Sequence, residues 1–217
     1  MRKIDLFLFD LDGTLIDSKR DIAASVNFTM AKLGLPRLPD DLIYSFVGHG
    51  VTPLIRQTVE AAGGSAAGGF DQAMAIFKAH YDQHLLDTTE AFPGVREVLK
   101  HFLGKKKIVL TNKSQGFSDK ILKGLALSPS FDGVFGGDTE FPKKPAPDVV
   151  HHLLKTYGVS PKHAVIVGDS RVDMETGTNA GILRCGVTYG FRPRAELEDA
   201  GFDYMIERPE ELLSLFD

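Results

Sequence analysis

Short apolar runs that end in a small polar or acidic residue recur along this chain and alternate with segments of helical spacing. The first run comprises Ile4 and Leu6–Phe9 and ends at Asp10. Its length and its phenylalanines are typical of a strand buried on both faces. The later runs are Ile108–Leu110, Val134–Phe135, Ala164–Val167, Leu183–Thr188 and Tyr204–Ile206. Because strands that alternate with helices form βαβ units, the pattern predicts an α/β fold with a doubly wound, mainly parallel sheet.

The stretch from about Ser18 to Leu85 breaks this alternation, since it carries apolar stripes at helical spacing and no convincing strand. The stripes run from Ile22 to Leu33, from Val51 to Ala62 and from Phe70 to Leu85, and the segment Gly63–Gly69 is expected to be a flexible joint between the last two. Asp17-Ser18 is expected to cap the first helix. We therefore predict a helical cap over residues 17–88, inserted into a core of residues 1–16 and 89–217. We expect it to open and close about its two connections.

Composition argues against several classes of protein. The 217 residues carry a formal charge of −4 at pH 7, whereas a protein that neutralises many nucleic-acid phosphates is usually basic. The single Cys185 excludes an internal disulfide and any zinc site built from several cysteines. Asp5 and Asp10 interrupt the N-terminal apolar run, unlike a signal peptide, and no run approaches the roughly 18 apolar residues of a membrane span. We expect a soluble, cytoplasmic monomer or homodimer without nucleic-acid or membrane partners.

Polar side chains follow the predicted strands at the points where these end. In an open parallel sheet, ligands bind beyond the carboxyl ends of the strands, so these side chains are expected to converge. They are Asp10 and Asp12 after the first strand, Thr111 and Asn112 after the second, Asp169 and Asp173 after a later one, and Lys144 in a nearby loop.

The charge of such a cluster needs compensation. Two unit charges about 4 Å apart repel by roughly 4 kcal/mol at an effective dielectric of 20, and one lysine does not offset four carboxylates. Either some carboxyl groups are protonated or a cation lies among them. Oxygen ligands without a His or Cys cluster favour a hard cation such as Mg²⁺, which commonly binds carboxylates together with a phosphate oxygen.

These motifs, taken in order, resemble those of the haloacid dehalogenase superfamily of phosphohydrolases. The four matching segments are Asp10-Leu11-Asp12-Gly13-Thr14-Leu15, Thr111-Asn112, Lys144-Pro145-Ala146-Pro147 and Gly168-Asp169-Ser170-Arg171-Val172-Asp173. The resemblance covers essentially the whole chain, and the helical insertion after the first motif is similar to the family's smaller α-helical cap. A Rossmann-like core is therefore expected.

The resemblance implies a two-step phosphoryl transfer. Asp10 would be the nucleophile that forms an aspartyl-phosphate, and Asp12 would be the general acid and then the general base. Thr111, Asn112 and Lys144 would bind the phosphate. The resemblance also implies that Mg²⁺ is held by Asp10, by the main-chain carbonyl of Asp12 and by Asp169. Asp173 would be a more distant or water-mediated partner of the metal that also orients Lys144.

Within the superfamily, Asp12 favours phosphate ester chemistry, because an alkoxide leaving group needs a proton. The start of the chain and the cap segment around Gly48-His49-Gly50 look most like phosphoglycolate phosphatases. Glycines at a helix start let the backbone approach a ligand, so we expect this segment to recognise the leaving group.

Three other activities fit the same scaffold: inorganic pyrophosphatase, 5′-nucleotidase, and sugar-phosphate phosphatase or mutase. A signalling domain that is phosphorylated on aspartate also combines a parallel sheet, an acidic pocket and Mg²⁺. The helical insertion and the second aspartate, two residues after the first, argue against the signalling domain, since a phosphorylation switch needs no acid or base there.

Overall fold

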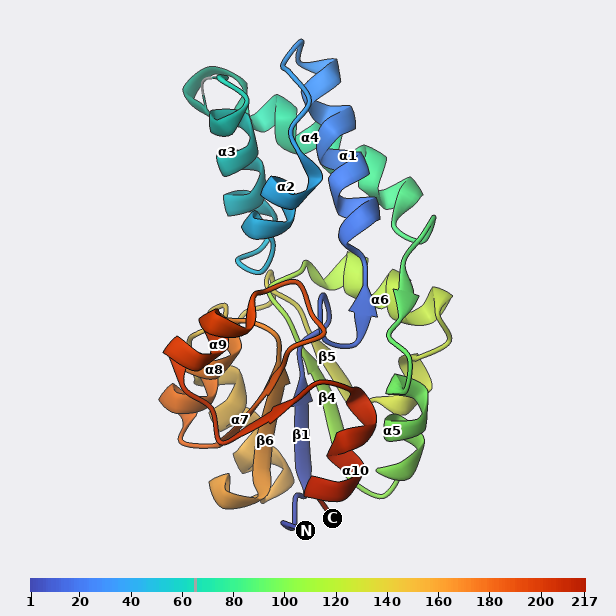
Figure 1. Ribbon diagram of the computed structural model, residues 1–217, viewed down its shortest axis with the longest axis vertical. Helices are drawn as coiled ribbons and strands as arrows, with labels where there is room; N and C mark the ends of the chain where they lie inside the picture. The colour runs from blue at the N-terminus through green and yellow to red at the C-terminus, as the bar shows by residue number, and fades with distance from the viewer. Residues whose placement is uncertain (65) are drawn as a thin grey trace.

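A six-stranded, fully parallel sheet forms the centre of the computed structural model, which describes residues 1–64 and 66–217 (Figure 1). The strand order is β5-β4-β1-β6-β7-β8. The strands are β1 (Leu6–Phe9), β4 (Lys106–Leu110), β5 (Gly133–Phe135), β6 (Ala164–Gly168), β7 (Leu183–Val187) and β8 (Tyr204–Ile206). This confirms the predicted doubly wound α/β fold, and every predicted strand is present with its ends shifted by two residues or fewer.

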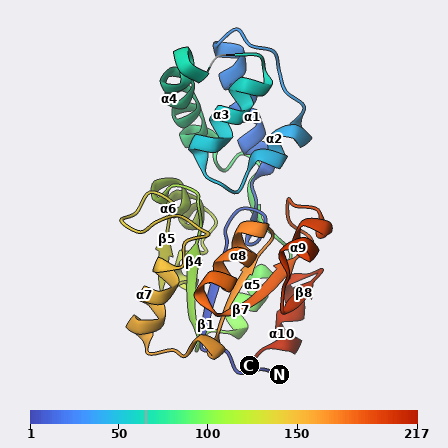
Figure 2. The ribbon, with the colours of Figure 1, turned by 90° about the vertical axis from the view of Figure 1, so that its left-hand side faces the viewer.

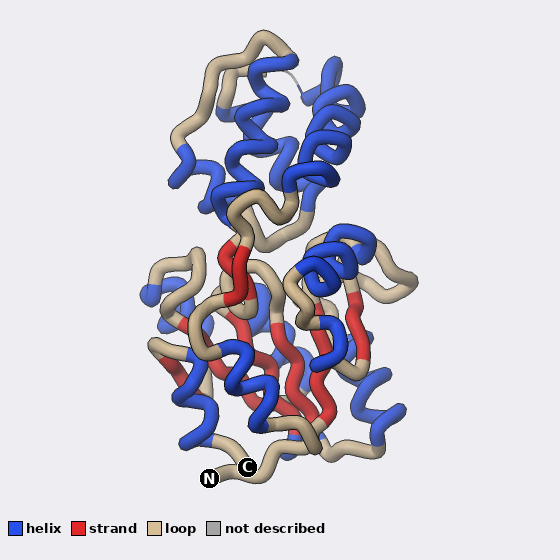
Figure 3. The backbone as a smooth tube through the Cα atoms, turned by 90° about the vertical axis from the view of Figure 1, so that its right-hand side faces the viewer, coloured by secondary structure: helices blue, strands red, loops and turns tan. Residues whose placement is uncertain are grey.

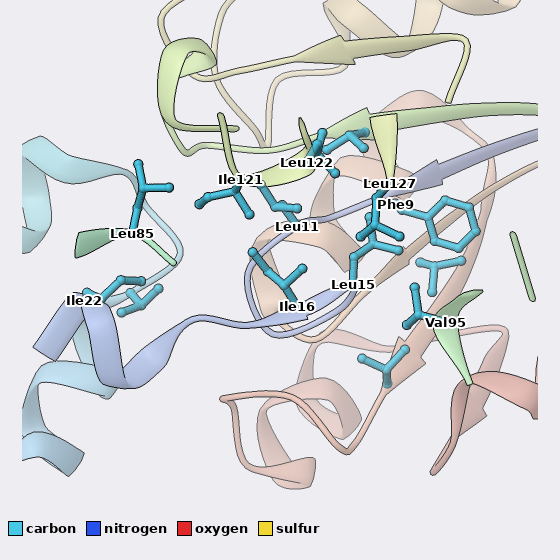
Figure 4. Close-up of a cluster of buried hydrophobic side chains, with 14 of the residues drawn as sticks. Phe9, Leu11, Leu15, Ile16, Ile22, Leu85, Val95, Ile121, Leu122 and Leu127 are labelled. Atoms are coloured by element: carbon cyan, nitrogen blue, oxygen red, sulfur yellow. The ribbon is translucent and has the colours of Figure 1, made fainter. Parts of the chain in front are cut away.

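The sheet is buried on both faces, because alternate residues of its central strand pack into two different cores. Phe7 and Phe9 of β1 belong to a cluster that includes residues of α5 (Val95–His101), α6 (Gln115–Gly124) and α10 (Leu212–Leu215). Figure 4 shows the part of this cluster around Phe9, Leu11 and Leu15. Leu6 and Leu8 point to the opposite face, where their cluster includes residues of α7 (Asp148–Tyr157) and α8 (Arg171–Ala180). The remaining helix of this layer is α9 (Arg194–Ala200).

Four helices, which we call the cap, stand above the carboxyl ends of the strands (Figures 1 and 2). They are α1 (Lys19–Lys32), α2 (Asp40–Phe46), α3 (Val51–Ala61) and α4 (Ala66–His84). Buried residues of the predicted stripes, such as Val26 of α1, Ile55 of α3 and Phe77 of α4, hold the cap together. Ser65, within the predicted joint Gly63–Gly69, lies outside the described residues, and α4 begins in the second half of that joint.

The chain enters and leaves the cap through one narrow ribbon. Strands β2 (Ile16–Asp17) and β3 (Glu90–Ala91) pair antiparallel between the cap and the sheet (Figure 3). Beside the ribbon, the carboxylate of Asp21 accepts hydrogen bonds from the backbone N–H and hydroxyl groups of both Thr88 and Thr89, over 2.6–3.0 Å. The boundaries after residues 16 and 88 remain predictions, and they fall at this ribbon.

Three short 3₁₀ helices, η1 (Ser128–Ser130), η2 (Pro161–His163) and η3 (Pro209–Glu211), complete the described elements. Within the described part of the chain, no helix combines the length and the apolar character needed to cross a membrane. Both termini lie at the end of the sheet that is remote from the cap (Figures 1 and 3).

Candidate active site

Parallel strand ends bring the predicted acidic residues together under the cap. Asp10 directly follows β1, and its backbone N–H donates to the carbonyl of Val167 in the neighbouring strand β6 at 2.9 Å. Asp169 follows β6, and Asp173 lies in the first turn of α8. Carboxylate oxygens of Asp10, Asp169 and Asp173 all lie within 4.8 Å of one another, and the three residues are buried.

Lys144 supplies the positive charge next to two of these carboxylates. Its buried Nζ lies 2.9 Å from Oδ1 of Asp10 and 2.5 Å from Oδ1 of Asp173. The other oxygen of Asp173 accepts from the hydroxyl of Ser170 at 2.6 Å, so Asp173 is held from both sides. Burial alone would lower the pKa of Lys144, but the two carboxylates raise it above its usual value, and the lysine stays charged.

Asp169 has no such partner. It forms no ion pair within the described chain, and its Oδ2 accepts one hydrogen bond, from the backbone N–H of Phe191 at 2.7 Å. Burial and the neighbouring carboxylates of Asp173 and Asp10 raise its pKa well above the ordinary value. Burial likewise raises the pKa of Asp10 to about 6, against the lowering effect of Lys144. The cluster therefore has more negative charge than Lys144 neutralises, and its oxygen-only donor set fits Mg²⁺.

Gly13 allows the first motif to pass against Asp169. Its φ of +82° is in the left-handed region, and a Cβ at this position would lie 2.2 Å from Oδ2 of Asp169. No side chain fits in that space without displacing the carboxylate. The glycine after the second aspartate is thus required by both conformation and contact.

The carboxylate of Asp12 belongs to a second, separate cluster. Its two oxygens lie 3.0 and 3.1 Å from Nζ of Lys113, and Oδ1 also accepts a hydrogen bond from the hydroxyl of Ser18. Ser18 stands at the N-cap position of α1 as predicted, but its hydroxyl makes no capping bond there; the carboxylate of Asp17 accepts from the backbone N–H of Lys19 at 3.4 Å.

The same Lys113 contacts the cap. Its Nζ donates to the hydroxyl of Tyr81 in α4 at 2.7 Å. Neither Lys113, Tyr81 nor Ser18 was among the predicted site residues. Lys113 had a sequence signal, since it directly follows Thr111-Asn112 at a strand end, whereas Tyr81 reads as one more apolar residue of a helical stripe.

A pocket of about 530 Å³, partly open to solvent, lies between the cap and the strand ends. Its cap side is mostly apolar, and its core side is polar. The lining residues are Ile22, Val47, Gly48, Gly50, Val51, Leu54, Phe77 and Tyr81 from the cap, and Asp10, Asp12, Thr111, Asn112, Lys113, Ser114 and Phe117 from the core.

The predicted cap segment reaches this pocket with its backbone. Gly48 and Gly50 line it, whereas the side chain of His49 is exposed and is not among the lining residues. Gly50 has a φ of +91°, and a Cβ there would lie 2.9 Å from the carbonyl oxygen of Asn112. The segment therefore presents main-chain groups, and not the side chain of His49, to the pocket.

Two core side chains hold the cap segment in place. The amide nitrogen of Asn112 donates to the carbonyls of Gly48 and Lys144, each at 3.1 Å. A phosphate contact of Asn112 remains a prediction, since both N–H groups of its side chain are donated to carbonyls. The guanidinium of Arg192, which the sequence reading missed, donates to the carbonyls of Ser45, at 2.5 Å, and Val47.

The chain is similar in sequence to known hydrolases. The family model of haloacid dehalogenase-like hydrolases matches residues 7–187. A phosphoglycolate phosphatase of Aquifex aeolicus is 34% identical over 214 residues, which cover 98% of this chain and 96% of that protein. One from Colwellia psychrerythraea is 33% identical and covers 98% of this chain and 97% of that protein.

Solved structures agree with the sequence comparisons. The crystal structure of a predicted phosphoglycolate phosphatase from Haemophilus somnus superposes with a TM-score of 0.94 at 27% identity, over 99% of both chains. A haloacid dehalogenase-like family hydrolase from Streptococcus pneumoniae superposes with a TM-score of 0.87 at 28% identity, over 98% of both chains.

Proposed function

This chain belongs to the haloacid dehalogenase-like hydrolase family and is a phosphoric monoester hydrolase, and on that basis we propose that it hydrolyses a small phosphate monoester, 2-phosphoglycolate first, through an aspartyl-phosphate. The proposal names Mg²⁺ as the cofactor. One observation carries it: two lysines whose side chains are little exposed, Lys144 and Lys113, divide the acidic groups into one cluster around Asp10 and another around Asp12.

In the first step, a carboxylate oxygen of Asp10 attacks phosphorus. The bond between phosphorus and the ester oxygen breaks, its electron pair goes to that oxygen, and Asp12 gives the oxygen a proton. The products are an alcohol, the phosphorylated Asp10 and the carboxylate of Asp12. Lys144 and the hydroxyl of Thr111 hold phosphoryl oxygens during the transfer.

In the second step, Asp12 takes a proton from water while the water oxygen attacks phosphorus. The bond between phosphorus and Asp10 breaks, inorganic phosphate leaves, and both carboxyl groups return to their starting states. The separation of the two clusters supports this division of labour, because the acid and base group is not engaged by the lysine that serves the nucleophile.

Mg²⁺ fits the excess negative charge next to Asp10. We propose Asp10, Asp169 and the main-chain carbonyl of Asp12 as its ligands, with Asp173 as an indirect partner, because both oxygens of Asp173 already accept hydrogen bonds from Lys144 and Ser170. When bound, the cation neutralises charge on the phosphoryl group and on the surrounding carboxylates.

The names of the relatives support a short leaving group, that of 2-phosphoglycolate. Gly50 and Val51 at the start of α3 offer backbone N–H groups that would receive the carboxylate of glycolate. His49 contributes through its backbone at most, because its side chain is exposed.

The test is phosphate release from a panel of esters and pyrophosphate, with Mg²⁺ and with EDTA. We expect Mg²⁺-dependent release that is greatest for 2-phosphoglycolate and absent in Asp10→Asn. Release that is greatest with a nucleotide, a sugar phosphate or pyrophosphate would overturn the proposed substrate, 2-phosphoglycolate, but would leave the proposed mechanism in place. Release that persists in Asp10→Asn would overturn the mechanism.

A further inference from the structure

Lys113 joins the proposed acid and base of the core to the cap, and nothing in the steps above uses it. We propose that Lys113 is a positioning residue that holds the carboxyl group of Asp12 toward the leaving group, and that Tyr81 of the cap holds Lys113 in that position. The inference rests on the proposed function, since it requires Asp12 to act as the acid and base.

The geometry of Lys113 leaves its ammonium group little freedom. Its side chain is 7% exposed, and that of Asp12 is 11% exposed. An ammonium group has three N–H donors, and Nζ has three acceptors within 3.1 Å: both oxygens of Asp12 and the hydroxyl of Tyr81. The contact to both oxygens fixes the plane of the carboxyl group as well as its distance. Ser18 adds a further donor on Oδ1.

Tyr81 is itself held between cap and core. It is buried, stacks on Phe77 of α4 with ring centroids 5.4 Å apart, and makes a T-shaped contact with Phe117 of α6, with ring centroids 5.2 Å apart. Burial raises the pKa of Tyr81 to about 12, so its hydroxyl is neutral and accepts a hydrogen bond from Lys113. The phenol leaves this position if α4 moves away from the core. The orientation of Asp12 therefore depends on the cap being seated.

Lys113 does not exchange a proton in the proposed reaction. In the first step, Asp12 loses its proton to the ester oxygen and becomes a carboxylate, and the ammonium group of Lys113 is already in place beside the charge that forms there. Such preorganised charge stabilises the transition state without rearrangement. In the second step, Asp12 is protonated again while Lys113 stays charged.

Substrates whose leaving groups differ in acidity distinguish the positioning of Asp12 by Lys113 from a general effect of the substitution on folding. p-Nitrophenolate leaves without a proton, whereas the alkoxide of glycerol 2-phosphate needs one, and both leaving groups lack a carboxylate. For Lys113→Met, we expect kcat/KM to fall about 10²-fold with glycerol 2-phosphate and less than about threefold with p-nitrophenyl phosphate. Tyr81→Phe should show the same selectivity with a smaller loss, about fivefold, and Lys113→Arg should recover part of the activity.

Lys120→Met is the matched control. Lys120 of α6 also bridges core and cap, through an ion pair with Asp82 of α4, but it does not contact Asp12. We expect its kcat/KM to stay within about twofold of the parent on both substrates. If Lys120→Met reproduced the selective loss, cap seating alone would explain the effect, and the role of Lys113 would be overturned.

Asp12→Asn distinguishes failure of the inference from failure of the proposed function. If this variant lost no more activity with glycerol 2-phosphate than with p-nitrophenyl phosphate, Asp12 would not be the acid. If Asp12→Asn lost kcat/KM mainly with glycerol 2-phosphate, but Lys113→Met lost kcat/KM equally with both substrates, the inference alone would fail. A Lys113→Met loss confined to 2-phosphoglycolate would also overturn it, since Lys113 would then bind the leaving-group carboxylate. Circular dichroism checks folding, and Tyr81→Phe keeps the test open if Lys113→Met does not fold.

Discussion

The two walls of the pocket are built on opposite principles. The core wall presents charged and polar groups whose positions are fixed by other protein groups, as Lys144 fixes Asp10 and Asp173. The cap wall presents apolar side chains such as Leu54 and Phe77, main chain at Gly48 and Gly50, and one described hydroxyl, that of Tyr81.

This difference assigns separate tasks to the two walls. Phosphoryl transfer depends on exact positioning of charge, so a small shift on the core side is costly. Apolar contact is non-directional, so we expect the cap side to determine which leaving groups fit and to exclude water from them. Changes at the nucleophile should therefore lower the rate for every substrate, and changes at Asp12 or Lys113 should spare esters whose leaving group needs no proton. Changes in the cap should alter the preference among leaving groups that differ in shape.

The largest effect is expected for Asp10→Asn. Loss of the nucleophile should reduce kcat/KM by about 10⁴-fold or more for every ester, measured by phosphate release. Asp5→Asn, at the other end of the first strand and away from the pocket, is the control and should match the parent. If the loss in Asp10→Asn depended on the substrate, the core wall would also contribute to substrate preference, and the two walls would not have separate tasks.

A smaller effect is expected for the metal. Asp169→Asn should weaken Mg²⁺ binding by about tenfold or more, measured by calorimetry in the absence of substrate. Asp12→Asn should leave Mg²⁺ affinity nearly unchanged, because the carboxylate of Asp12 is engaged by Lys113 and Ser18 and only its carbonyl is proposed as a ligand. Equal losses in the two variants would show that the two acidic clusters are not separate.

On the cap wall, Gly50→Ala should raise KM about tenfold and alter substrate preference, with kcat changed less. The added Cβ would lie 2.9 Å from the carbonyl of Asn112 and 3.0 Å from Nζ of Lys143, and would push the cap segment away from the core. Gly34→Ala has a similar positive φ and no neighbour within 4 Å, so it controls for backbone strain. Identical kinetics for both variants would mean that the approach of Gly50 to the core is unimportant.

The smallest catalytic effect is expected at the ribbon. Asp21→Asn should lower the free energy of unfolding at pH 7 by about 1–3 kcal/mol, because an NH2 group replaces one of the two carboxylate oxygens that accept from Thr88 and Thr89. Its kcat/KM should stay near that of the parent. Urea denaturation measures the change, with exposed Asp41→Asn as the control.

Asp21 also predicts a pH dependence. Burial alone would raise its pKa, but the hydrogen bonds from Thr88 and Thr89 lower it below the usual value. The unfolded chain therefore takes up the proton first as pH falls, and stability due to Asp21 is present above about pH 4 and lost below it. The parent should lose more stability than Asp21→Asn between pH 5 and pH 3, and parallel curves would contradict this.

The core wall was predictable from the sequence, because residues that follow the carboxyl ends of parallel strands lie along the same edge of the sheet. Once the apolar runs are read as parallel strands, Asp10, Thr111 and Asp169 must meet at one edge of the sheet, whatever else the chain does. The buried strands themselves were recognisable, since both faces are apolar.

The cap wall was predictable only in part. Its helices follow from their stripes, but where they sit on the core does not, so Tyr81 and Arg192 gave no signal of their contacts. The two-residue strands β2 and β3 are too short for any periodicity. The role of His49 in substrate selection stays a prediction: its flanking glycines bring main chain to the pocket, and its own side chain is exposed. The cytoplasmic location and the absence of nucleic-acid partners remain predictions.

The antiparallel pairing of Ile16 with Ala91 and of Asp17 with Glu90 has a consequence for the history of such molecules. Because the chain departs and returns at neighbouring residues, everything between them is an insertion whose ends are already joined. Another segment with closely spaced ends could replace it without altering the order of the strands. Selectivity could thus be exchanged in one genetic step, by grafting at this junction, while the catalytic half is inherited intact.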